Sequence, residues 1–77
     1  MHIEVELIAF IQKYAPDGKS VFDMDLNDGA TISTVAEKLA IPDTEPRISL
    51  INGAHTTDDN ELHDGDTLVL LTPVEGG

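Results

Sequence analysis

The sequence predicts a small α+β domain in which one helix packs on one face of a mixed sheet of four to five strands. Three observations lead to this fold class. Apolar and polar residues alternate in two runs near the N-terminus, as they do in half-buried strands. A single stretch in the middle of the chain has the period of an amphipathic helix. A nearly all-apolar run close to the C-terminus is typical of a central strand.

The first two strands are predicted to form an antiparallel hairpin. In HIEVELIAF every second residue is apolar from Ile3 to Leu7, and in VFDMDL apolar residues again alternate with two aspartates. The KYAPDGKS stretch between them contains Pro-Asp-Gly, which is typical of turns. Two alternating runs joined by such a turn indicate a hairpin.

One amphipathic helix is predicted over residues 31–40. Thr31 is the expected N-cap, and Pro42 lies just beyond the end of the pattern, where a helix stops. The apolar face has the spacing i, i+3, i+4 and i+7, and its members are Ile32, Val35, Ala36 and Leu39.

The second half of the chain predicts the remaining strands. RISLING is expected to be a strand that ends in an Asn-Gly pair, which favours a type I′ hairpin turn. A short return strand is expected from His55 to Thr57, followed by a turn-rich surface loop anchored by Leu62. TLVLL is the expected central strand. The domain is thus predicted to span residues 1–72, with a flexible tail of residues 73–77 that ends in Gly-Gly.

Composition excludes several classes of function. Fifteen acidic residues against four basic ones give a formal net charge of -11, which repels nucleic acids and anionic membranes. This charge either serves solubility or steers the protein onto a basic partner. The chain offers no nucleophile beside a base and little room for a pocket of about 300 Å³, so we expect a non-catalytic protein without a bound cofactor. Without a readable signal peptide or membrane span, a cytoplasmic location is expected.

Two sets of residues are of metal-binding type, and neither predicts a metal site. The acidic loop lacks the ligand order and central glycine of a calcium-binding EF-hand. The histidines lack the spacing of a zinc site. These residues are Asp58, Asp59, Glu61, Asp64 and Asp66 in the first set, and His2, His55 and His63 in the second.

An ordered set of stretches resembles the MoaD/ThiS family of sulfur-carrier proteins. The likeness is carried by the opening alternating strand, by INGAHTTDDNELHDGDTLVLL and by the tail PVEGG. FIQKY lacks the arginine that molybdopterin-type members tend to have there, and KYAPDGKS is longer than the first loop of thiamine-type members. The subfamily is therefore open, and the length of the first loop and the tail lean slightly towards the molybdopterin type.

The resemblance implies a ubiquitin-like β-grasp fold and a chemical role for the tail. An activating enzyme related to ubiquitin activators would use ATP to adenylate the Gly77 carboxylate, and a sulfur donor would convert it to a thiocarboxylate. The acceptor would be a synthase, of the type of the molybdopterin synthase large subunit or of thiazole synthase. Gly76, which has no Cβ, would let the tail enter a narrow channel.

Three alternatives remain beside this role. The same activated Gly77 could form isopeptide bonds with lysines of target proteins, as a modifier does. The chain could instead be a β-grasp interaction module that is never activated. The two glycines could also be a frayed end or a processing scar.

A partner-docking surface is predicted near the tail. If Leu68 and Leu70 face the core, then Val69 and Leu71 point from the opposite sheet face. The alternation of the first strand leaves two alternatives for Ile8 and Phe10: they lie beside Val69 and Leu71, or they wrap around the core. The sequence pattern does not determine which sheet face Ile48 and Leu50 occupy. The predicted docking residues are Phe10, Val69, Leu71, Pro73 and Val74.

Overall fold

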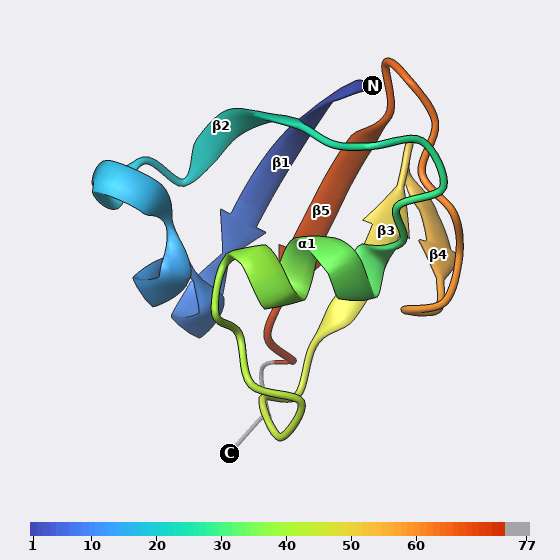
Figure 1. The fold of residues 1–77 in the computed structure, drawn as a ribbon. Helices are drawn as coiled ribbons and strands as arrows, with labels where there is room; N and C mark the ends of the chain where they lie inside the picture. The colour runs from blue at the N-terminus through green and yellow to red at the C-terminus, as the bar shows by residue number, and fades with distance from the viewer. Residues whose placement is uncertain (74–77) are drawn as a thin grey trace.

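The computed structural model describes residues 1–73 and contains a five-stranded sheet with one α-helix across it (Figure 1). The predicted α+β class is therefore confirmed. Two short 3₁₀ helices, η1 and η2, connect the first two strands. The elements are β1 (His2–Ile8), η1 (Ala9–Tyr14), η2 (Pro16–Gly18), β2 (Val21–Asp25), α1 (Ile32–Lys38), β3 (Ile48–Ile51), β4 (Ala54–Thr56) and β5 (Thr67–Leu71).

The sheet has the strand order β2-β1-β5-β3-β4, so β5 lies at its centre as predicted. It pairs in parallel with β1 and antiparallel with β3. The first two strands form the expected antiparallel pair. The last strand of the chain is consequently hydrogen-bonded along both of its edges, with the N-terminal strand on one side.

The connection between β1 and β2 is more structured than a turn. The strand ends at Ile8 because Ala9 has a φ of 65°, which is incompatible with a pleated strand. The chain then forms η1, in which Ile11 is fully buried. The expectation that the first strand continues to Phe10 is therefore wrong. At the other hairpin, Asn52 and Gly53 have φ values of 51° and 86°, which confirms the type I′ turn.

Helix α1 begins as predicted, with a capping box at Thr31. The side chain of Thr31 accepts a hydrogen bond from the Thr34 N–H, and the Thr34 side chain accepts one from the Thr31 N–H. The helix ends two residues earlier than expected, because Ala40 has a φ of 60°. The Ile41 N–H then bonds the carbonyl of Ala36, which closes a Schellman motif.

The core lies between α1 and the sheet face that it crosses (Figure 1). Leu68 and Leu70 of β5 are fully buried there, and Leu62 anchors the acidic loop as predicted. The core residues that the sequence pattern assigned to β1 and α1 are confirmed: Ile3, Val5, Leu7, Ile32, Val35 and Ala36. In the described part of the chain, no helix is long and apolar enough to cross a membrane.

Candidate functional site

The sheet face opposite α1, which we call the open face, has a continuous apolar region. Residues that lie directly opposite each other in paired strands project from the same face, so the register defines two rows across the sheet. These rows are Val21–Glu6–Val69–Leu50–His55 and Ile8–Leu71–Ile48.

The register also decides the faces of β3 that the sequence pattern left open. Ile48 and Leu50 pair with Leu71 and Val69, and therefore belong to the open face. Ser49 is buried on the core side, in agreement with its pairing to Leu70. The predicted docking residues Val69 and Leu71 thus lie in a larger apolar surface than the sequence suggested.

Part of this surface is strongly exposed within the described chain. On this face Val21 is 47% exposed and Ile8 38%, whereas the apolar residues of β3 and β5 are half-buried. Phe10 lies in η1, beyond the end of β1, and is 77% exposed. The alternative in which Ile8 and Phe10 wrap around the core is therefore wrong, and Ile11 fills that place instead. Exposed apolar side chains that gather on one face are characteristic of a protein interface.

The end of β5 is joined to η1. The Phe10 N–H donates a hydrogen bond to Thr72 Oγ1 at 2.9 Å, and the Thr72 N–H approaches the Ile8 carbonyl at 3.5 Å. Thr72 is buried, whereas Pro73 is exposed. The last described residues therefore follow the central strand, next to Phe10 and to the apolar end of the open face.

The remaining predicted tail residues lie outside the described residues. They are the docking residue Val74, the access residue Gly76 and the chemical residue Gly77. Their roles, and the boundary between a domain of residues 1–72 and a tail of 73–77, stay predictions.

The opposite end of the open face is acidic. Glu4 pairs with Asp23, and His2 pairs with Asp25 in the next row. The His2 Nδ1 atom lies 2.8 Å from Asp25 Oδ1, and Nε2 lies 3.6 Å from Asp23 Oδ1. The hydrogen bond with Asp25, together with the negative charges of Asp23, Asp25 and Asp64, raises the pKa of His2 above 6.5. The open face thus has an apolar half near Pro73 and an acidic half at the far end.

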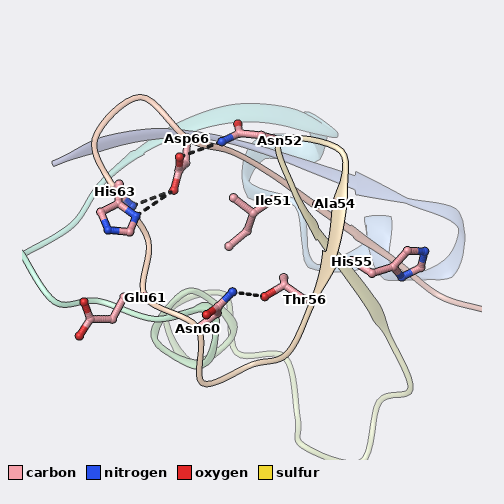
Figure 2. A pocket seen from close by; sticks show the side chains of 9 residues that line it. All are labelled: Ile51, Asn52, Ala54, His55, Thr56, Asn60, Glu61, His63 and Asp66. Carbon is pink, nitrogen blue, oxygen red and sulfur yellow. Dashed lines mark hydrogen bonds and ion pairs between the residues drawn. The ribbon is translucent and has the colours of Figure 1, made fainter.

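A concave region, separate from the open face, lies between the β3–β4 hairpin and the loop before β5 (Figure 2). Its volume is about 320 Å³, and Ile51 projects into it. Asn52 Nδ2 donates to Asp66 Oδ1 at 2.9 Å, and Asn60 donates to Thr56. All of its lining residues come from one continuous stretch, residues 51–66. The expectation of little room for a pocket of about 300 Å³ is therefore wrong for this depression, because the hairpin and the following loop fold around it. Its polar side chains are largely paired with one another, and it lacks the nucleophile-and-base arrangement of a catalytic site.

The acidic loop uses its carboxylates within the fold. Asp58 Oδ2 lies 2.6 Å from Arg47 Nη2, and Asp59 accepts a hydrogen bond from Thr57 Oγ1 at 2.6 Å. The Thr57 hydrogen bond lowers the pKa of Asp59. Within residues 1–73, no three metal-binding side chains gather closely enough to hold an ion.

Comparison with known proteins agrees with this geometry. The family model described as the ThiS family matches residues 5–77. No curated protein matches the chain.

Solved structures with the same fold include two archaeal proteins and one bacterial complex. SAMP1 from Haloferax volcanii has a TM-score of 0.79 and 22% identity, over 100% of both chains. Putative molybdopterin converting factor, subunit 1, from Pyrococcus furiosus has a TM-score of 0.75 and 22% identity, over 95% of this chain and 98% of that one. A chain of the complex of subunits 1 and 2 of molybdopterin-converting factor from Helicobacter pylori has a TM-score of 0.66 and 22% identity, over 100% of both. The fold is therefore the predicted ubiquitin-like β-grasp.

Proposed function

Because the chain belongs to the ThiS family, we propose that it is a sulfur carrier whose Gly77 carboxylate is adenylated and then thiocarboxylated. The observation that carries this proposal is the family match, which extends to Gly77. The fold supports it, since β5 leads from the centre of a rigid sheet to an exposed Pro73 beside an apolar docking surface.

The chemistry divides between this chain and its partners. The Gly77 carboxylate attacks the α-phosphorus of ATP in the activating enzyme and displaces pyrophosphate. Sulfide released by a sulfur donor then attacks the acyl carbon and displaces AMP, which leaves a thiocarboxylate. The ATP is bound by the activating enzyme, and this chain supplies the carboxylate and the docking surface. It acts as a carrier subunit without catalytic groups or a cofactor of its own, in the cytoplasm.

A second partner receives the sulfur. The similar chain from Helicobacter pylori is found in a complex of subunits 1 and 2 of molybdopterin-converting factor. This supports an acceptor of the molybdopterin synthase type, with the thiazole synthase type as the alternative. The apolar half of the open face, next to the tail, is the surface that such a synthase would cover.

The experiment that tests the carrier function is the intact mass of the protein after reaction. The protein is incubated with the activating enzyme from the same organism, ATP and a sulfur donor. Replacement of one oxygen by sulfur is expected in the full chain and not in a variant that lacks Gly76 and Gly77. An unchanged mass with an activating enzyme that modifies its other carriers would refute the proposal.

A second candidate function is protein modification through Gly77. The likeness to SAMP1 from Haloferax volcanii favours it, because that protein is a small archaeal modifier protein. Activation is shared with the carrier function, so the final acceptor decides between the two. A ladder of covalent conjugates in cell extract would identify a modifier, whereas sulfur transfer without conjugates would identify a carrier.

A third candidate is a β-grasp interaction module that never activates its tail. Such a module would retain its partners and its function after removal of Gly76 and Gly77. Pull-down of the same partners by both forms, with no loss of cellular function, would favour it over the carrier.

A further inference from the structure

An acidic side chain lies within the apolar half of the open face. The register places Glu6 directly between Val21 on β2 and Val69 on β5. Side chains that face each other in this way have Cβ atoms about 4.5–5.5 Å apart. Glu6 therefore has an apolar neighbour on each side, and its backbone is fixed in β1 by pairing to both adjacent strands.

Glu6 has no basic partner in the part of the chain that the structure describes. Lys13 lies 3.9 Å from Glu45, and Arg47 is paired with Asp58. Within residues 1–73, neither Lys19 nor any other basic side chain lies within ion-pair distance of Glu6. The residue is half-buried, and its side chain belongs to the open face.

We propose that the activating enzyme presents a lysine or arginine side chain to Glu6 when it covers the open face, and that this ion pair selects the enzyme. The inference rests on the proposed function, because it concerns the enzyme that activates Gly77. A surface that covers Val69 and Val21 removes water from the carboxylate between them. A carboxylate that loses its water without gaining a counter-charge strongly disfavours a complex.

The charge of the whole chain points to the same partner chemistry. The formal net charge is -11, and the far end of the open face carries Glu4, Asp23 and Asp25. A complementary surface is basic around an apolar centre. Glu6 adds selectivity to this general attraction, because a purely apolar surface would leave its charge unpaired.

The test compares two charge reversals that alter the net charge equally. Glu6→Lys reverses the charge inside the apolar rows, whereas Glu37→Lys reverses an exposed charge on α1, away from the open face. Glu6→Gln removes the charge while keeping the shape of the side chain. Binding to the activating enzyme from the same organism is measured by calorimetry, at about 0.15 M salt to screen long-range attraction. The circular dichroism spectrum and melting temperature of each variant verify the fold.

We expect Glu6→Lys to weaken binding by about 100-fold or more and Glu6→Gln by about 10-fold or more, as for the loss of one member of a desolvated charge pair. Glu37→Lys should change binding by less than about threefold. Equal effects of Glu6→Lys and Glu37→Lys, or full binding by Glu6→Gln, would overturn the inference. If wild-type protein is still thiocarboxylated in that case, the proposed function stands; if it is never thiocarboxylated by a competent enzyme, both fail.

Discussion

Replacing Thr72 with valine is expected to loosen η1 from the end of β5. Thr72 is 5% exposed, and its Oγ1 atom accepts the hydrogen bond from the Phe10 N–H. Valine has nearly the same volume as threonine but cannot accept a hydrogen bond. The substitution therefore removes this one interaction while it keeps most of the packing around residue 72.

The size of the effect follows from the environment of the donor. A hydrogen bond contributes about 0.5–1.5 kcal/mol net, and an unsatisfied buried donor costs about 1–3 kcal/mol. The Phe10–Thr72 bond is only partly buried, so water can replace part of it. We expect the free energy of unfolding to fall by about 1–2 kcal/mol. A protein of 77 residues is stable by about 4–12 kcal/mol, and the variant should remain folded.

Urea unfolding measures the loss of stability, and amide hydrogen exchange measures how firmly η1 is held against β5. The Thr72→Val protein should unfold at lower urea, and the Phe10 amide should exchange faster than in the wild type. Thr72→Ser is the matched control, because it keeps the hydroxyl group and loses a methyl group. Unchanged exchange of Phe10 in Thr72→Val, with equal stability of the two variants, would show that this bond does not hold η1.

Three further predictions concern other parts of the fold. Ala40→Gly should raise the free energy of unfolding by about 0.5–1 kcal/mol in urea titrations, since glycine accepts the positive φ at this helix end without strain; equal or lower stability would refute this. Asp58→Ala should lower the free energy of unfolding by about 1–3 kcal/mol, because the Arg47 side chain is only 7% exposed and would lose its counter-charge. The effect is limited to this range because Asp58 itself is 43% exposed and partly screened by solvent. An unchanged free energy of unfolding would contradict the pairing. Folding raises the pKa of His2, so its contribution to stability is complete below about pH 6.5 and is lost as the pH rises through the higher folded value. In a proton NMR titration, Asp25→Asn should therefore shift the His2 midpoint downward, and an unchanged midpoint would disprove the role of Asp25.

Local patterns were sufficient to predict most elements of the fold. The alternation around Val5 and the helical spacing from Ile32 to Leu39 each arise from one face packing on the core. Thr31 and the Asn52-Gly53 pair have residue types that match their backbone geometry, so the cap and the turn could be identified as well.

Element ends were harder to predict where alanine adopts an unusual conformation. Ala9 and Ala40 both have positive φ values, and nothing in an alanine indicates this, because the left-handed region favours glycine. At both positions the surrounding packing and hydrogen bonds decide the backbone conformation. The strand therefore ends before Phe10, and the helix ends before residue 40.

The site was predicted only in part, because its members come from strands that are distant in the sequence. Alternation within TLVLL identified Val69 and Leu71 correctly as residues opposite the core-facing leucines. In β3 most residues are apolar, so only pairing with β5 places Ile48 and Leu50 on the open face. Alternation showed that Glu6 faces outward, but its apolar neighbours follow from the register with β2 and β5.

The central position of β5 has a mechanical consequence. A partner that pulls on the chain beyond Pro73 applies force along β5, which is bonded to β1 on one side and to β3 on the other. Such a load shears both ladders at once instead of peeling an edge strand one hydrogen bond at a time. The domain should therefore resist traction on its C-terminus much better than traction on the edge strand β4. If an activating enzyme acts on Gly77 as proposed, it can therefore pull on the chain beyond Pro73 without unfolding the sheet.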